Sequence, residues 1–200
     1  MMKKKIIITI GREFGSGGVA TATELGKRLG IPVYDKELIE KAAQDSGFSA
    51  GYFEKNDEKK SLFSFSSIFS GESYINDNGL FNIQCETIRR IAEQDSAIMV
   101  GRCSDYVLRD FDNVFNVFLT APVEARIARV MERDGISREE AQSKIEKKDK
   151  CRAEYYNYYT FGNWGVASTY NLCIDTSLTG IDGAADIIIN VLKIANLIDE

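Results

Sequence analysis

The chain has 200 residues, 44% of them hydrophobic, a size that suits one α/β domain with a full core and one insertion. Its 25 basic and 30 acidic residues give a net charge of −5, which argues against a protein that coats nucleic acid or another polyanion. It contains no histidine, so an imidazole base, an imidazole metal ligand and the usual serine or cysteine triads are excluded.

The cysteines and the N-terminal residues bear on where the protein works. The four cysteines stand far apart without disulfide or metal spacing, which is typical of reduced thiols. The basic start is followed by a short apolar run before Gly11, too short for a signal sequence or a membrane span, and no later run is long enough. We therefore expect a cytoplasmic protein with no membrane segment and no metal site built from its side chains.

The first predicted elements are a strand, a glycine-rich turn and a helix over residues 6–23, which read I-I-I-T-I-G-R-E-F-G-S-G-G-V-A-T-A-T. A buried parallel strand fixes such a loop, and glycines let backbone N–H groups close on an anion. The following helix directs its positive end toward the same place. This order predicts a phosphate-binding loop, and a glycine-rich turn without a ligand is the alternative.

The loop departs from the standard pattern G-x-x-x-x-G-K-[ST], whose lysine reaches the terminal phosphates and whose hydroxyl binds magnesium. If Gly15 and Gly17 take the glycine positions, Gly18 stands where the lysine belongs, and Val19 offers no hydroxyl. A working enzyme must therefore bring a cation from elsewhere. The candidates in the predicted lid are Arg126, Arg129 and Arg152, and Arg12 at the entrance of the loop is a local substitute.

Five short apolar runs separated by helix-length segments predict a mostly parallel sheet covered by helices on both faces. The expected strands are 6–10, 32–34, 97–100, 114–119 and 171–174. The expected helices are 19–29, 36–44, 81–94, 123–133, 138–159 and 181–197. No internal repeat interrupts them, so residues 1–200 form one predicted domain.

Between residues 46 and 82 the composition changes to glycine, serine, asparagine and phenylalanine, with S-L-F-S-F-S-S-I-F-S at its centre. So few long aliphatic residues favour a flap whose aromatic rings pack when a ligand binds. A poorly ordered surface insertion explains the same composition.

A second group of polar residues follows the run 97–100, in the segment I-M-V-G-R-C-S-D-Y-V-L-R. Arg102 and Asp105 would lie at the carboxyl edge of a parallel sheet, where open α/β folds bind ligands. Arg102 suits a phosphate or a base edge, and Asp105 can accept from an amine or orient a magnesium-bound water. Alternatively, Asp105 only caps the next helix and Arg102 pairs with it.

Two predicted helices over residues 126–160 carry many cations. Arg126, Arg129 and Arg133 are spaced by three and four residues, so they share one helix face. A second cluster comprises Lys147, Lys148, Lys150 and Arg152. The two helices could close over a polyphosphate, or their cations could form a solvated face balanced by neighbouring glutamates.

Aromatic residues gather between 155 and 164. The block contains Tyr155, Tyr156, Tyr158, Tyr159, Phe161 and Trp164. It is dense enough to stack a nucleobase, but clusters of this kind are more often core packing or an interface. This aromatic block could also form the surface of a homodimer.

Five segments together resemble the cytidylate kinase-like family of P-loop nucleoside monophosphate kinases. They are I-T-I-G-R-E-F-G-S-G-G, L-G-K-R-L-G-I-P-V-Y-D-K-E-L-I, V-G-R-C-S-D-Y-V-L, F-L-T-A-P-V-E-A-R and Y-N-L-C-I-D-T-S, and they leave out only about 46–82. The resemblance implies an α/β, three-layer P-loop kinase fold. Its five-stranded parallel sheet would have the order 2-3-1-4-5, with an acceptor-side insertion and a helical lid. It also implies phosphoryl transfer from ATP with Mg²⁺ to CMP or dCMP.

By position, the resemblance also implies roles for individual residues. The ATP-binding set is Arg12, Gly15, Ser16, Gly17, Gly18 and Val19. The acceptor-binding set is Asp35, Arg102, Asp105 and Asp149, and the catalytic candidates are Arg102, Arg126 and Arg152. The expected partners are small nucleotide substrates. The acceptor can be a nucleoside monophosphate or another small molecule. The alternative, suggested by the missing lysine, is a non-catalytic nucleotide-binding or sensing protein that kept the fold.

Overall fold

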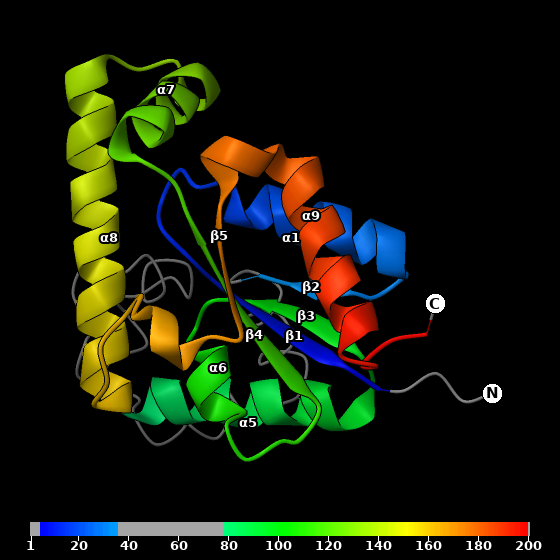
Figure 1. Cartoon of the computed structure of the whole chain (residues 1–200). Helices are drawn as coiled ribbons and strands as arrows, with labels where there is room; N and C mark the ends of the chain where they lie inside the picture. Colours follow the sequence, from blue (N-terminus) through cyan, green and yellow to red (C-terminus); the bar gives the residue numbers. More distant parts are fainter. Residues whose placement is uncertain (1–4, 36–77, 200) are drawn as a thin grey trace.

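The computed structural model describes residues 5–35 and 78–199, which form one open parallel sheet with helices on both faces (Figure 1). The strands are β1 (Ile7–Arg12), β2 (Val33–Tyr34), β3 (Ala97–Val100), β4 (Val114–Thr120) and β5 (Leu172–Asp175). The helices are α1 (Gly18–Leu29), α5 (Asn78–Gln94), α6 (Ser104–Val107), α7 (Val123–Asp134), α8 (Arg138–Thr160), the 3₁₀ turn η2 (Ala167–Thr169) and α9 (Thr176–Ile194).

The sheet has the order β2-β3-β1-β4-β5, and every pairing is parallel. Strand β1 lies at its centre: Ile7 pairs with Ala97 of β3 on one side and with Val114 of β4 on the other. Because β1 is covered on both faces, its first four residues are all buried apolar or β-branched residues. The predicted fold class and strand order are therefore confirmed.

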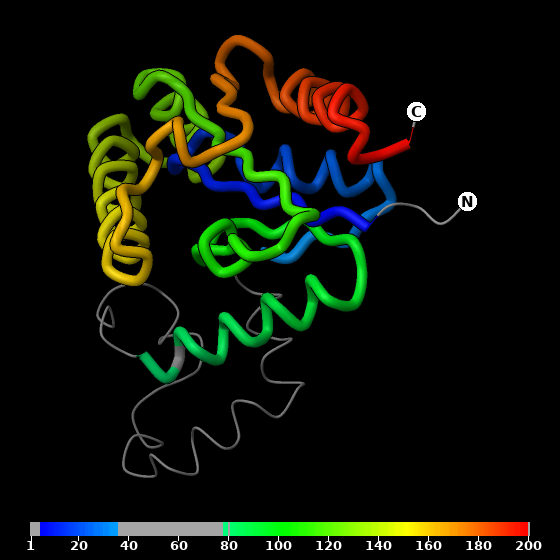
Figure 2. The backbone as a smooth tube through the Cα atoms, turned by 60° about the horizontal axis from the view of Figure 1, so that its bottom comes forward, coloured from blue at the N-terminus to red at the C-terminus, as the bar shows by residue number. Residues whose placement is uncertain are grey.

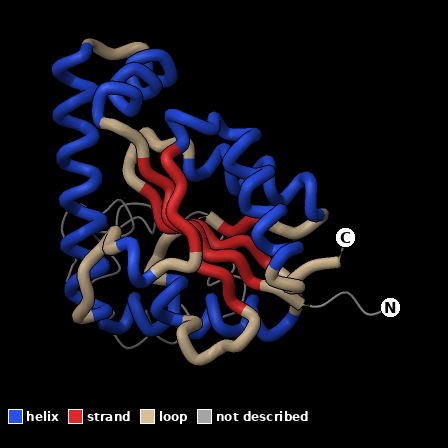
Figure 3. The backbone as a smooth tube through the Cα atoms, viewed as in Figure 1, coloured by secondary structure: helices blue, strands red, loops and turns tan. Residues whose placement is uncertain are grey.

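Figure 3 shows the strands of the sheet with helices on both sides. Two hydrophobic clusters hold these layers together. On one face, alternate residues of β1 pack with α1 and α9, through residues such as Leu25 and Ile188. On the other face, Ile7 and Met99 pack with α5 and α6, through residues such as Ile88 and Val107. Figure 2 shows α5 below the sheet, with α1 and α9 above it. Helices α1 and α9 therefore cover one face of the sheet, and α5 and α6 cover the other.

Helices α7 and α8 lie in contact beside the sheet, and together they span the region predicted as a lid (Figure 1). Ser137 and Glu140 make the predicted capping box at the start of α8, and Gly135 ends α7 with a left-handed φ of 65°. A small cluster that includes Ile127 and Ile145 joins the two helices, and the ring of Phe14 packs against it. The pair is thus anchored to the loop that follows β1.

Some predicted boundaries differ from the structure. Helix α9 begins at Thr176 rather than 181, because Asp175 caps it by accepting from the Ser177 N–H, and it kinks at Gly180. The one-turn helix α6 was not predicted, because four residues are too few to show a helical period. The predicted helix 36–44 lies outside the described residues. So does most of the predicted insertion 46–82, whose last five residues begin α5.

The described helices also bear on membrane insertion. None of those within residues 5–35 and 78–199 combines the length and the apolar character that a bilayer crossing needs.

Candidate active site

The carboxyl ends of β1 and β3 mark the place where this fold can bind a ligand. The chain leaves β1 toward α1 on one face and leaves β3 toward α6 on the other. Adjacent parallel strands whose connections diverge in this way leave a crevice at their carboxyl edge. The predicted phosphate loop, residues 13–17, and the predicted acceptor segment, residues 101–105, lie on the two sides of that crevice.

The backbone of residues 13–17 has the shape that an anion-binding loop needs. Gly15 and Gly17 have left-handed φ angles of 83° and 84°, which other residues rarely adopt. Gly17 is the N-cap of α1, and no side chain caps this helix end and no acidic residue lies in its first turn. The positive end of α1 therefore faces the loop without competition from a carboxylate of its own first turn.

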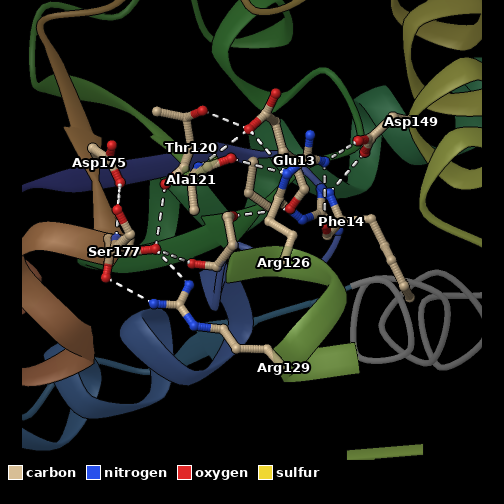
Figure 4. A network of polar contacts seen from close by, with 12 residues as sticks. Glu13, Phe14, Thr120, Ala121, Arg126, Arg129, Asp149, Asp175 and Ser177 are labelled. Carbon is tan, nitrogen blue, oxygen red and sulfur yellow. Dashed lines mark hydrogen bonds and ion pairs between the residues drawn. The ribbon is translucent and has the colours of Figure 1, made fainter. Parts of the chain in front are cut away.

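Two neighbouring segments, the end of β4 and the start of α9, fix the loop in place (Figure 4). Thr120 Oγ1 donates to Glu13 Oε2 at 2.5 Å, and the N–H of Ala121 donates to the same oxygen at 3.2 Å. From the start of α9, Thr176 Oγ1 donates to the carbonyl of Ser16 at 2.7 Å. The buried hydroxyl of Ser16 itself donates to the Glu13 carbonyl, so it is a loop-closing group in this conformation.

Helices α7 and α8 contact the loop through charged side chains. Arg126 Nη1 lies 2.5 Å from Asp149 Oδ2, and Asp149 Oδ1 accepts from the N–H of Phe14 at 2.7 Å. Arg126 also donates to the carbonyls of Ala121 and Phe14. Arg152 donates to the carbonyl of Arg12 at 3.0 Å. The structure thus brings Arg126, Asp149 and Arg152 to the phosphate loop, as side chains that hold its backbone.

Arg12 lies in a group of cations at the crevice. Burial, followed by the charges of Arg152 and Arg102, lowers the pKa of Arg12 to about 9, while Asp35 and Asp149 act in the opposite direction. Burial also lowers the pKa of Arg152, although Asp149 opposes this. At neutral pH both guanidiniums are charged, so an anion bound between them would relieve their mutual repulsion.

The acceptor side of the crevice is a tight turn. Gly101, Arg102 and Cys103 have consecutive positive φ angles of 75°, 60° and 55°, which is unusual for two residues with side chains. Such backbone strain gathers at functional sites because the surrounding fold must hold it. The Arg102 guanidinium lies over the ring of Tyr155 at 5.8 Å, and Asp105 accepts from Tyr156 Oη at 2.8 Å.

The carboxylate of Asp105 is partly buried and accepts a hydrogen bond from Tyr156. Burial raises its pKa, while the hydrogen bond from Tyr156 works against that rise. Burial, followed by the charge of Asp105 and the same hydrogen bond, raises the pKa of Tyr156, so the phenol keeps its proton and remains the donor. The negative charge of Asp35, which directly follows β2, works to raise the pKa of Arg12.

The remaining predicted site residues lie on α1 and α7. Arg129 donates to the side chain and the carbonyl of Thr176, and therefore ties α7 to the start of α9 (Figure 4). Arg133 pairs with Asp134 and lies over the ring of Phe14. Val19 is 49% exposed in the first turn of α1.

The aromatic block divides between packing and surface. Tyr159 stacks on Phe81 of α5 with ring centroids 3.9 Å apart, Tyr155 Oη donates to Gln84, and Trp164 packs edge-on against Phe118. Phe161 is 92% exposed. Most of these rings therefore fasten α8 to the sheet layers, whereas base stacking and a homodimer surface stay predictions.

Several residues that shape the site were missed by sequence reasoning, namely Glu13, Gln84, Thr120, Tyr156 as a hydrogen-bond donor, and Thr176. Thr120 and Thr176 each stand at the carboxyl end of an apolar run, which is the same signal that identified Arg102. Glu13 stands within the quoted loop motif, but the motif does not show that its carboxylate faces Thr120 rather than a ligand.

The residues present fit a nucleoside triphosphate better than a protein-bound metal. In the described ranges, no group of three or more Cys, Asp or Glu side chains is placed to hold a metal ion. The hydroxyl that the standard loop offers to magnesium is absent at Val19. Mg²⁺ arriving with ATP would therefore be held mainly by phosphate oxygens and water.

Comparisons with known proteins agree with this geometry. A solved structure of an uncharacterized protein from Eubacterium ventriosum is 32% identical and superposes with a TM-score of 0.75 over 94% of this chain and 99% of its own. Shikimate kinase from Bacteroides thetaiotaomicron superposes with a TM-score of 0.55 at 14% identity, over 94% and 98% of the two chains, which shows the fold alone. The fold is thus that of the P-loop kinases.

Sequence relatives specify the family. The cytidylate kinase from Methanopyrus kandleri is 27% identical over 88% of this chain and 88% of its own, and that from Pyrococcus horikoshii is 28% identical over 94% and 88%. The model of the cytidylate kinase-like family matches residues 7–178. The chain belongs to the cytidylate kinase-like family. Its relatives are kinases, so phosphoryl transfer is the class of chemistry and ATP use is implied.

Proposed function

We propose that this protein transfers the γ-phosphoryl group of ATP, with Mg²⁺, to a nucleoside monophosphate, with CMP or dCMP as the first acceptors to test. The observation that carries the proposal is the meeting of two segments at one crevice. The glycine loop with the N-terminus of α1 lies on one side, and the strained turn with Arg102 and Asp105 lies on the other.

Backbone and cations suffice for this chemistry in principle, because phosphoryl transfer depends mainly on positioning and charge neutralisation. The loop N–H groups and α1 would bind the donor phosphates, and Arg102 would bind the acceptor phosphate. Asp105 can accept a hydrogen bond from an amino group of the acceptor base. Mg²⁺ supplies further charge neutralisation on the donor phosphates when it is bound.

No proton acceptor is required when the attacking phosphate is a dianion. One of its oxygens forms the new bond to phosphorus, and the β–γ bridging oxygen of ATP leaves with the electron pair. The products are ADP and a nucleoside diphosphate. The absence of histidine from the sequence is compatible with this route.

A non-catalytic nucleotide sensor is the second candidate, and one contact favours it. The Phe14 N–H, which a donor phosphate could use, is hydrogen-bonded to Asp149, and Gly18 contributes no cation. A sensor would bind nucleotide through the same loop but would show no acceptor-dependent release of ADP.

The deciding experiment has two stages. A thermal-shift panel of nucleotides with and without Mg²⁺ identifies ligands, and a coupled assay then measures ADP release from ATP with each nucleoside monophosphate. We expect ADP release to require the acceptor. Nucleotide binding without turnover on any acceptor would replace the kinase proposal with the sensor.

A further inference from the structure

Gly18 is a glycine for reasons of space rather than of backbone conformation. Unlike Gly15 and Gly17, it does not have a left-handed φ, and it occupies the first helical position of α1. A Cβ built on Gly18 would lie 2.6 Å from Arg12 Cγ and 2.7 Å from Arg12 Cβ. The stem of Arg12 therefore fills the space into which a side chain at position 18 would extend.

The far end of the same side chain meets a second glycine. A Cβ built on Gly101, at the end of β3, would lie 1.9 Å from Arg12 Nη1 and 2.9 Å from Cζ. Arg12 thus runs from the donor loop to the acceptor turn, along a path that two glycines leave open. Its guanidinium lies at the boundary of β1 and β3, where the crevice opens.

The Nε atom of Arg12 is buried and has no hydrogen-bond partner among the described residues. Within residues 5–35 and 78–199, two buried side-chain polar atoms have no hydrogen-bond partner, and they are Arg12 Nε and Thr21 Oγ1. A buried cationic donor without a partner costs free energy, and the neighbouring charges of Arg152 and Arg102 add to that cost. An anion in the crevice would relieve both.

The other arginines near the loop already have protein partners. Arg126 donates to Asp149 and to the carbonyls of Ala121 and Phe14. Arg129 donates to the hydroxyl of Thr176. Arg152 donates to the Arg12 carbonyl. Each would have to exchange existing contacts to reach a phosphate at the crevice, whereas Arg12 Nε would gain one.

We propose that Arg12 takes the place of the lysine that the phosphate loop lacks, and that Gly18 is the complementary change that makes room for it. The cation comes from strand β1 instead of helix α1, and binds the phosphoryl group as it passes from donor to acceptor. The inference rests on the proposed function, and it names the residue on which turnover depends.

The test removes the cation at position 12 and then places a cation at position 18 instead. Arg12→Met keeps the stem and removes the charge, so we expect acceptor-dependent turnover to fall by about 10³-fold. Gly18→Ala keeps Arg12 but pushes its stem aside, so turnover should fall as well. The double variant Arg12→Ala/Gly18→Lys restores a lysine at its standard position, and should exceed Arg12→Ala by at least tenfold. Arg138→Met, on the exposed start of α8, is the matched control and should keep the parent rate.

A second readout is independent of turnover. Inorganic tripolyphosphate should raise the melting temperature of the parent and of Arg138→Met, and it should raise that of Arg12→Met much less. Far-UV circular dichroism checks that each variant is folded, and Arg12→Gln, which also removes the charge, replaces Arg12→Met if the latter does not fold. Full tripolyphosphate stabilisation of the charge-removed variant, or turnover within threefold of the parent, overturns the inference. A parent that is stabilised through Arg12 but never turns over refutes the kinase proposal alone.

Discussion

The backbone N–H of Phe14 and the carboxylate of Asp149 are joined by a 2.7 Å hydrogen bond across 135 positions of sequence. The same carboxylate pairs with Arg126, which also contacts the Ala121 and Phe14 carbonyls and lies 3.6 Å from Glu13 Oε2. We therefore expect this ion pair between α7 and α8 to hold the predicted phosphate loop in its conformation and to affect both stability and binding.

The first prediction concerns that pair. The two side chains are only 11% and 17% exposed, so removal of either leaves a largely desolvated charge that keeps only a longer ion pair. Arg126 would keep Glu13 at 3.6 Å, and Asp149 would keep Arg152 at 3.8 Å. Arg126→Met and Asp149→Leu should each lower the free energy of unfolding by about 3 kcal/mol. The double variant should lose clearly less than the sum, with a coupling of about 1.5 kcal/mol or more. Guanidinium denaturation measures all three, and additive losses would show that the two charges act separately.

The second prediction concerns Thr176, which is fully buried. Its hydroxyl donates its one hydrogen to the Ser16 carbonyl at 2.7 Å, with the Thr120 carbonyl as a longer acceptor at 3.2 Å, and its oxygen accepts from Arg129. Thr176→Val keeps the shape but leaves these groups without a partner, so it should cost about 1 to 3 kcal/mol of stability and weaken ADP binding. Thr23→Val, on the exposed side of α1, is the control and should change neither. Calorimetry and thermal unfolding test both.

The third prediction separates donor from acceptor. Arg102→Ala and Asp105→Ala should weaken acceptor binding by about 1.5 to 3 kcal/mol, because each removes a charge-assisted hydrogen bond. ATP affinity should change much less, since the loop and α1 are untouched. Isothermal calorimetry with each nucleotide decides it. If the loss falls on ATP instead, these two residues belong to the donor site.

The fourth prediction is a pH dependence. The Tyr156 hydroxyl stabilises ionised Asp105 and so opposes the rise that burial imposes on its pKa. Tyr156→Phe removes that donor, so the pKa of Asp105 should rise further. If ionised Asp105 binds the acceptor, the acidic limb of kcat/KM for the acceptor should move to higher pH. Tyr158→Phe, whose side chain is 42% exposed, should leave the limb in place. An unmoved limb in Tyr156→Phe would remove Asp105 ionisation from acceptor binding.

The sequence predicted the strands well because each is a short apolar run that ends at a polar residue. Residues 97–100 form β3 as expected, and the capping box at Ser137 marks the start of α8. These signals are local, so they can be read from neighbouring positions. The sheet order came from the family resemblance, since strand pairing is a long-range property that periodicity does not contain.

The details of the site could not be predicted, for the same reason. The glycines of the loop suggest an approaching anion, but only the structure shows that a Cβ on Gly17 would lie 2.3 Å from Ile181 Cδ1. Likewise, the missing lysine at Gly18 reads as a loss until the stem of Arg12 is seen beside it. Gly17 and Gly18 thus leave space for the side chains of Ile181 and Arg12, and this can be seen only from contacts in the fold.

Helix α8 carries its contacts on one face: Asp149 and Arg152 reach the donor loop, and Tyr155 and Tyr156 reach the acceptor elements. A helix moves as a stiff rod, so a nucleotide that displaces the Phe14 contact also shifts the group that holds Asp105. A coupling free energy would then link the two sites, and such linkage is reciprocal. The factor by which bound ATP changes the affinity for the acceptor must equal the factor by which bound acceptor changes the affinity for ATP.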